Sequence, residues 1–330
     1  MKILVTGATG LLGANVVRVL LEREMGEVRV LVRPSASRVA IDGLPVEIVA
    51  GDVEDAASVA NAARGCGALF HVAGIAEAGG VTEERLWAVN VAGTENACRA
   101  AQAVGARLVH TSSASAIDAA PPGELADENT RSGTLGRGTQ PYARSKKAAE
   151  GVVLRAVSKG LDAVIVSPTL MFGEWDVKPT SGKMIVLAAR GPVPIYPVGG
   201  GNVIDVRDAA VGHAEAFRRG KSGERYILGH ENLSYRELLA IVRAVVGRGA
   251  PFIPLWPGPA MAAAWLARPI LRRIGGAAAE LFTPEAIAAS ARSHYTSPAK
   301  AVRDLGLPQS PVEAAIDRAA RWLRDRGYFK

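Results

Sequence analysis

The sequence contains few cysteines, and this scarcity excludes several classes of protein. Its 330 residues include two, Cys66 and Cys98, which have neither metal-ligand spacing nor the pattern of a disulfide framework. We expect reduced thiols and a cytoplasmic protein. The five histidines are scattered without an HExxH sequence, so no metal site is predicted. The lack of a GxSxG sequence argues against an α/β-hydrolase.

Long apolar runs and basic tracts are also missing. No apolar stretch reaches the roughly 20 residues that a membrane span needs. The most apolar one, Ala260–Leu271, is interrupted by Arg268 and Pro269, and we expect a core or groove-covering helix there. The N-terminal apolar run is short and leads into glycines, unlike a signal peptide. The formal charge of +7 is spread along the chain, which predicts neither a nucleic-acid nor a membrane partner.

The residues that are present indicate an α/β fold with a doubly wound parallel sheet. Hydrophobic residues are 48% and charged residues 22%, as in a globular protein with a large core. Apolar runs of strand length alternate with helical segments, which favours parallel strands with helices on both faces. The predicted strands are Lys2–Thr6, Val28–Val32, Val46–Val49, Ala68–Val72, Arg107–Thr111 and Ala163–Ser167. The predicted helices are Leu11–Glu24, Asp55–Arg64, Thr82–Val104 and Pro141–Lys159.

The alternating pattern loosens after Pro168, where Pro and Gly become frequent. We therefore expect a sheet domain over residues 1–167, with a return strand near 203–228, and a smaller substrate-binding lobe over 168–330. Loops of that lobe, Leu170–Lys183 and Ile195–Asn202, are expected to shape a substrate pocket, where Trp175 and Tyr196 could stack on a ring. Two capping boxes, beginning at Ser234 and Ser310, predict helix starts.

A glycine-rich turn follows the first predicted strand. Its sequence is Thr6-Gly7-Ala8-Thr9-Gly10-Leu11-Leu12-Gly13, and a helical pattern comes next. In a dinucleotide-binding turn the first glycine permits the tight turn, the second lets backbone amides approach a pyrophosphate, and the third allows close helix packing. The start of the helix offers free N–H groups to the phosphates.

Two further groups of residues indicate proton-transfer chemistry. Tyr142 and Lys146 are four apart on a predicted helix, so both side chains share one face. A nearby ammonium lowers the pKa of a phenol, which is normally about 10. Ser112 and Ser113 follow the fifth predicted strand, at the sheet edge where ligands bind in such folds.

Together these motifs resemble the extended short-chain dehydrogenase/reductases, the NAD-dependent epimerase/dehydratase family, which have a Rossmann-type sheet. Within that family the chain is similar to the dihydroflavonol-reductase-like and hopanoid-associated sugar-epimerase-like branch. The resemblance implies a catalytic set of Ser113, Tyr142, Lys146 and Asn90, although Ser112 could take the place of Ser113. It implies cofactor contacts from Gly7, Thr9, Gly10, Leu11, Leu12, Gly13, Arg33, Arg38, Asp52, Val53, Val72, Ala73, Gly74, Tyr142, Lys146, Pro168 and Thr169.

The residue after the second predicted strand bears on the choice of cofactor. An acidic residue there would hold the ribose hydroxyl of NAD, but this chain has Arg33, with Arg38 nearby. A guanidinium pairs well with a 2′-phosphate. The sequence therefore favours NADP(H), with NAD(H) as the alternative.

The resemblance implies an oxidoreductase that reduces a ketone or aldehyde to an alcohol. In this reading Tyr142 supplies the proton, Ser113 holds the carbonyl oxygen, and Lys146 lowers the Tyr142 pKa and binds the nicotinamide ribose. A nucleotide-sugar epimerase or dehydratase with tightly bound NAD, and a non-catalytic cofactor sensor, remain alternatives. A small-molecule carbonyl or alcohol is the expected substrate. A homodimer is expected through the alanine-rich helices Thr82–Val104 and Pro141–Lys159.

Overall fold

Seven parallel strands form the central sheet of this computed structural model. The structure describes residues 1–75, 81–121, 123–133, 135, 140–191, 195–248, 253–274, 287, 291 and 293–330. The strands lie in the order β10-β6-β5-β4-β1-β2-β3. Their bounds are β1 (Lys2–Thr6), β2 (Glu27–Val32), β3 (Glu47–Ala50), β4 (Cys66–His71), β5 (Arg107–Thr111), β6 (Ala163–Pro168) and β10 (Arg225–Leu228). This is the Rossmann order, and the strand sequence reverses between β1 and β4, where such sheets bind ligands.

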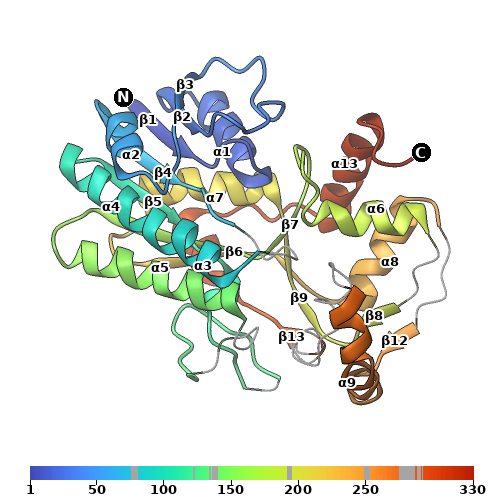
Figure 1. The fold of residues 1–330 in the computed structure, drawn as a ribbon. Coiled ribbons are helices and arrows are strands. Elements are labelled where there is room, and N and C mark those ends of the chain that lie inside the picture. Colours follow the sequence, from blue (N-terminus) through green and yellow to red (C-terminus); the bar gives the residue numbers. More distant parts are fainter. Residues whose placement is uncertain are drawn as a thin grey trace.

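Helices cover both faces of this sheet, and each face has its own apolar core (Figure 1). One face carries α1 (Leu11–Glu22), α7 (Val206–Arg219) and α12 (Ala299–Leu305). The other carries α2 (Ala56–Ala63), α4 (Gly93–Val104) and α5 (Pro141–Val157). Strands such as β6 are buried along their whole length, as is typical of a parallel sheet with two covered faces.

The helix predicted over Thr82–Val104 is present, but it is not uniform. It begins as α3 (Glu83–Trp87), passes through a π-helical segment (Ala88–Ala92), and continues as α4. The π-helical segment contains Asn90. Such segments are rare and often accompany functional sites, because the extra residue per turn re-aims side chains.

A second sheet begins the smaller lobe. It contains β7 (Leu170–Phe172), β9 (Gly200–Asp205), β11 (Glu231–Ser234) and β13 (Ser293–His294), with β9 at its centre. The short strands β8 (Ile195–Pro197) and β12 (Ile253–Leu255) pair separately. Residues 203–205 of the segment expected to return to the main sheet therefore lie in this second sheet, whereas β10 adds to the main one.

Among the residues that the structure describes, four helices belong to the lobe. They are α6 (Gly182–Arg190), α8 (Tyr235–Val245), α9 (Pro257–Ile274) and α13 (Val312–Asp325), and α6, α8 and α13 share a third apolar core with the second sheet. Figure 1 shows them on the opposite side of the molecule from α4 and α5. In the part of the chain that the structure describes, no helix is both long and apolar enough to cross a membrane.

The two predicted capping boxes have different outcomes. Ser234 and Glu237 form the reciprocal pair of hydrogen bonds at the start of α8, as predicted. The prediction at Ser310 is wrong, because α13 begins at Val312 after Pro311 without a side-chain cap. The Ser310 hydroxyl donates instead to Asp208, whose carboxylate also accepts the Ser310 N–H. Asp208 lies far away in the sequence, so local spacing could not reveal it.

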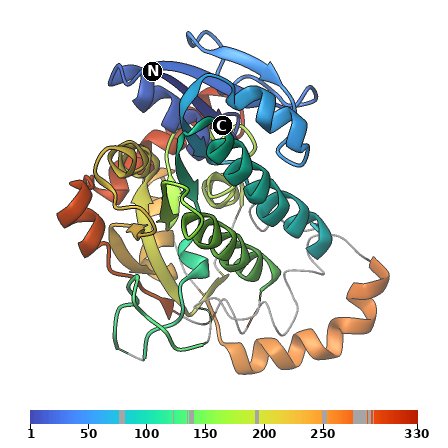
Figure 2. The same ribbon diagram turned by 90° about the vertical axis from the view of Figure 1, so that its left-hand side faces the viewer.

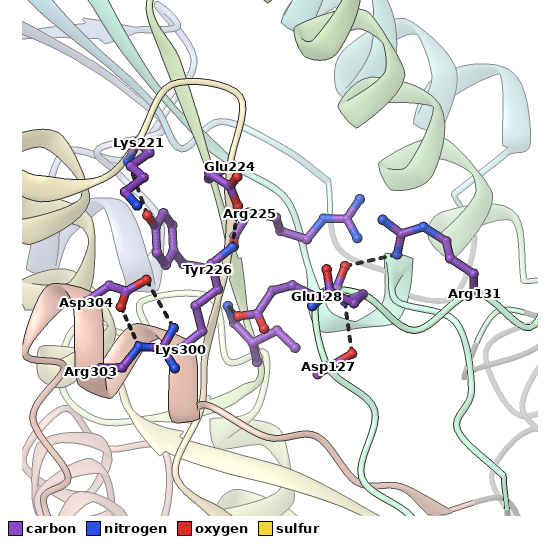
Figure 3. Close-up of polar contacts among 12 residues, drawn as sticks. Asp127, Glu128, Arg131, Lys221, Glu224, Arg225, Tyr226, Lys300, Arg303 and Asp304 are labelled. Atoms are coloured by element: carbon purple, nitrogen blue, oxygen red, sulfur yellow. Dashed lines mark hydrogen bonds and ion pairs between the residues drawn. The ribbon is translucent and has the colours of Figure 1, made fainter.

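Polar side chains protect the outer edge of the main sheet at β10. On one side Lys300 donates to Glu224 and to the carbonyl of Arg225, and its ammonium lies 4.6 Å from the centre of the Tyr226 ring. On the other side Glu128 accepts the N–H of Ile227 at 2.7 Å. Figure 3 shows Lys300 and Glu128 reaching the strand from opposite sides. These contacts occupy backbone groups that an edge strand would otherwise leave open for pairing.

Candidate active site

A cleft of about 430 Å³ opens at the carboxyl ends of the central strands and extends to the smaller lobe. Its position is the point where the strand order reverses, as expected for a doubly wound sheet. Most predicted cofactor residues line it, namely Gly7, Thr9, Gly10, Leu11, Leu12, Gly13, Arg33, Asp52, Val53, Val72, Ala73, Gly74, Tyr142, Lys146, Pro168 and Thr169. Ser113 lines it as well, whereas Arg38 and Asn90 do not belong to its described lining.

The glycine turn between β1 and α1 is closely packed. Gly7 has φ +75°, and a Cβ there would lie 2.6 Å from the backbone nitrogen of Ala73. A Cβ on Gly13 would lie 2.1 Å from the carbonyl oxygen of Gly7. Gly10 caps α1 without a side-chain acceptor, so the first-turn N–H groups are left for another partner. The turn therefore has the shape and the donors that a pyrophosphate needs.

The far end of the cleft lies beyond β2 and β3. Arg33 lines it together with Ser37, which the sequence prediction did not include, and Asp52 and Val53 after β3 line it too. Arg33 is exposed to solvent. Arg38 is exposed too, but it lies outside the described lining, so its predicted assistance to Arg33 has no support in this arrangement.

Lys146 on α5 is almost fully buried, with 5% of its surface exposed. Its Nζ donates to the carbonyl oxygen of Thr111 at the end of β5, 3.0 Å away. Burial lowers the pKa of Lys146 to about 8. Gly74 makes room for this ammonium, because a Cβ there would lie 2.9 Å from Nζ. Tyr142, one turn earlier on the same helix, also lines the cleft.

Two neighbouring serines follow β5, and the structure separates their roles. The Ser112 hydroxyl donates to Glu150 at 2.6 Å, in a fully buried contact. The Ser113 oxygen accepts the N–H of Ser115, which leaves its hydroxyl hydrogen available. Both serines line the cleft, and the free hydroxyl hydrogen of Ser113 favours it over Ser112 for holding a substrate oxygen.

Glu150 is a residue that the sequence reasoning missed. It lies four residues after Lys146, so the two share a face of α5, and this spacing was the available signal. Its carboxylate forms an ion pair with Arg225 of β10 and accepts the Ser112 hydroxyl. Burial raises the pKa of Glu150, while Arg225 and Ser112 act in the opposite direction.

Asn90 stands behind the cleft wall rather than in it. Its amide nitrogen donates to Ser145 at 3.0 Å and to the carbonyl of Ile75 at 3.2 Å, and its oxygen accepts the Ile75 N–H. Ser145 in turn donates to the carbonyl of Tyr142. In this arrangement Asn90 links the start of α5 to the segment after β4.

The lobe contributes five residues to the cleft: Met171, Asp176, Val177, Lys178 and Thr180. All belong to the predicted loop 170–183, whereas no described residue of 195–202 lines the cleft. Trp175 does not face a ligand, because its ring packs under the Arg18 guanidinium at 3.5 Å and against Trp322. Tyr196 lies in β8, outside the described lining. The stacking predicted for these two aromatics is therefore not supported.

The described part of the chain holds no group of three or more His, Cys, Asp or Glu side chains that could bind a metal. His71, His110 and His213 lie near one another in the sheet core, but they are fully buried and burial lowers the pKa of each.

A Rossmann sheet with this glycine turn and this cleft is the arrangement that binds a dinucleotide in doubly wound folds. Residues 3–229 match the NAD dependent epimerase/dehydratase family, and the chain belongs to that family.

Relatives span nearly the whole chain. A protein of Synechocystis sp., provisionally named dihydroflavonol 4-reductase, is 40% identical over 99% of this chain and 95% of its own length. Sterol demethylase protein B of Methylococcus capsulatus is 33% identical over 99% of both chains. The crystal structure of gox2253 superposes with a TM-score of 0.89 at 36% identity, covering 100% of this chain and 99% of that one.

Proposed function

We propose that this enzyme uses NADP(H) to reduce a ketone or aldehyde to an alcohol. The observation that carries the proposal is the meeting of Tyr142, Lys146 and Ser113 in one cleft with the glycine turn. A phenol beside a buried ammonium can act as a general acid near neutral pH. The neighbouring serine hydroxyl can hold the oxygen that receives the proton.

Ser113, Tyr142 and Lys146 each have a separate role at the substrate carbonyl in this proposal. Ser113 donates a hydrogen bond to the substrate carbonyl oxygen and so orients it. Tyr142 then gives its proton to that oxygen, and the phenolate that remains is stabilised by the Lys146 charge and is reprotonated from solvent. When bound, NADPH would supply the hydride for the carbonyl carbon, which balances the reaction to the alcohol and NADP⁺. The glycine turn would hold the pyrophosphate, and Arg33 would hold the 2′-phosphate.

The substrate is proposed to be a largely apolar molecule rather than a nucleotide sugar. The cations in the described lining of the cleft are Arg33, Lys146 and Lys178, and the first two already have cofactor roles in this proposal. Lys178 would be the single described cation left for a substrate diphosphate. On the lobe side, Met171 and Val177 offer apolar contacts beside the polar Asp176, Lys178 and Thr180. The two relatives above are named after a flavonoid and a sterol, which have extended carbon skeletons.

Replacing the proton donor tests the reaction. Tyr142→Phe should lower the turnover of NADPH with ketones by roughly a hundred- to ten-thousand-fold, the usual contribution of general acid catalysis. NADPH consumption is measured with a ketosteroid, an aryl ketone and an aliphatic aldehyde. Cofactor binding should persist, and Tyr235→Phe, on α8 outside the cleft, should keep full turnover. Near-full turnover in Tyr142→Phe would contradict the mechanism. Epimerisation of a nucleotide sugar without net NADPH consumption would favour the alternative.

A further inference from the structure

Exposed apolar side chains lie on the segment that leads into α9 and on the first half of that helix. Residues 253–267 have the sequence IPLWPGPAMAAAWLA, which contains no charged side chain and, apart from the indole N–H of its two tryptophans, no polar one. In the structure Trp256 is 62% exposed, Trp265 is 67% exposed and Leu266 is 72% exposed. We call these three residues the α9 apolar surface.

One face of α9 is already used by the protein itself. Ala260 and Ala264 are buried and form a small cluster with Ile287, with Leu255 and Met261 packed against it. Trp265 and Leu266 point to the other side and remain exposed. A surface helix normally carries polar residues on its outer face, and a helix that is apolar all round is buried against something. The outer face of α9 therefore requires a covering partner.

The place of α9 in the molecule leaves room for such a partner. Figure 2 shows the helix, in orange, projecting from the smaller lobe beyond the rest of the ribbon. It is 18 residues long, which corresponds to about 27 Å at 1.5 Å per residue. A helix of this length with one exposed apolar face can lie along a surface.

The charge pattern distinguishes a lipid surface from a second copy of the chain. No Asp or Glu occurs from residue 249 to residue 279, whereas Arg268, Arg272 and Arg273 do. In a symmetric dimer this segment would meet its own copy, which pairs two segments whose sequence carries basic and no acidic residues. An anionic headgroup layer complements them instead. Tryptophan is also enriched at the boundary between headgroups and acyl chains.

We propose that α9 docks this enzyme on an anionic phospholipid surface, with Trp256, Trp265 and Leu266 inserted among the headgroups. Interfacial helices of this kind combine an inserted apolar face with basic residues, and their binding grows with apolar area and anionic lipid. The docking is independent of the reaction proposed above, because it uses residues outside the cleft.

Vesicle sedimentation with the full chain tests this proposal. We expect binding to vesicles of three parts phosphatidylcholine to one part phosphatidylglycerol, weaker binding to pure phosphatidylcholine, and loss of binding with added salt. The double variant Trp265→Ser/Leu266→Ser should bind at least tenfold more weakly. A matched pair, Leu125→Ser/Val302→Ser, changes two exposed apolar residues elsewhere and should bind like the wild type.

Two further measurements separate lipid docking from misfolding and from self-association. The circular dichroism and melting temperature of both double variants should match the wild type, because all four side chains are exposed. If Trp265→Ser/Leu266→Ser does not fold, Trp256→Ser is the second test. Wild-type tryptophan fluorescence should shift to shorter wavelength on the anionic vesicles. Absence of vesicle binding, or equal binding by Trp265→Ser/Leu266→Ser, would overturn the proposal. A wild-type oligomer that this variant dissociates would instead identify the surface as an interface between copies.

Discussion

Lys146 is buried, and a carboxylate one helical turn away balances its charge. Burial lowers its pKa to about 8, while the attraction of Glu150 acts in the opposite direction. The other charges near this pair are Arg225, which is paired with Glu150, and Lys147 at the same carboxylate. His71 and His110 also face Lys146, but burial keeps them neutral at physiological pH. The charge that supports Tyr142 therefore depends on Glu150.

The pH dependence of ketone reduction should reflect the opposing effects of burial and of Glu150 on the Lys146 pKa. Lys146 loses its proton as the pH rises through about 8, so kcat/KM for ketone reduction should fall above that pH. Glu150→Gln removes the attraction that favours the charged ammonium, so the fall should move to lower pH. Ser112→Ala removes the hydrogen bond to Glu150 without changing a charge, and its profile should stay in place. A profile unchanged in Glu150→Gln, or moved equally in both variants, would show that Glu150 has only a structural role.

Arg33 is the residue on which the cofactor preference depends. A 2′-phosphate brings about two negative charges, which the guanidinium can meet with paired donors. Because Arg33 is exposed, we expect a preference for NADPH over NADH of about tenfold, which is the lower part of the range for charge-assisted bonds. Added salt should weaken this preference. Arg33→Asp should reverse the preference, while Arg38→Ala, outside the described cleft lining, should not. The dissociation constants come from direct titration, and equal values in the wild type would contradict the NADP(H) assignment.

At the scale of elements, the sequence contained enough to place most of the sheet. Runs such as Leu108–Val109 and Val164–Ile165 are apolar on both faces of their strands, which is characteristic of a parallel sheet between two helical layers. Features set by distant contacts could not be predicted. Trp175 packs on Arg18 and Trp322, and Ser310 is held by Asp208, so neither role is visible in neighbouring residues. The π-helical segment around Asn90 also leaves no simple pattern.

Three buried histidines, two in the main sheet and one on a helix that covers it, link the stability of the fold to pH. His71 on β4, His110 on β5 and His213 on α7 are fully buried, and neither ring nitrogen of His110 has a hydrogen-bond partner among the described residues. Burial lowers the pKa of His71 to about 3 and of His213 to about 4, and that of His110 well below its usual value. The unfolded chain therefore takes up protons first as the pH falls below about 6.5.

Acid should destabilise the fold through these histidines. Their contribution to stability is complete above about pH 6.5 and is lost on acidification towards the folded-state values, by up to about 1.4 kcal/mol per pH unit for each histidine. His110→Leu removes one such group, so the free energy of unfolding should fall less steeply between about pH 6 and pH 5. Urea unfolding at pH 8, 6 and 5 measures this, with pH 8 as the internal reference. An unchanged slope would show that His110 does not titrate on unfolding in that range.

At the scale of the whole molecule, the cleft is shared by the main sheet and the smaller lobe. The β1–α1 turn and the ends of β2 to β5 supply its cofactor side, and residues 171–180 supply the other side. The sequence indicated this division through the change in pattern after Pro168. The segment that lines the lobe side was predicted, but the particular residues of the lining depend on how β7 and α6 pack, which sequence spacing does not determine.

The expected homodimer needs a different argument from the one the sequence suggested. The alanines of α4 and α5 were expected to form an exposed face, but Ala97, Ala101 and Ala149 are fully buried inside this chain. The two helices lie side by side on one outer side of the molecule (Figures 1 and 2). The large apolar residues exposed on this helical layer are Leu154 of α5 and Trp87 of α3, and they could form the centre of a symmetric contact.

We therefore predict a homodimer in which Leu154 lies at the interface. Sedimentation velocity at micromolar concentrations should show a dimer for the wild type. Leu154→Glu places a charge into a surface that would meet its own copy, so two like charges would be buried near each other and the dimer should dissociate. Leu125→Glu, with 50% of the side chain exposed outside these helices, should leave the dimer intact. A wild-type monomer would remove the prediction, and a dimer that survives Leu154→Glu would place the interface elsewhere on the surface.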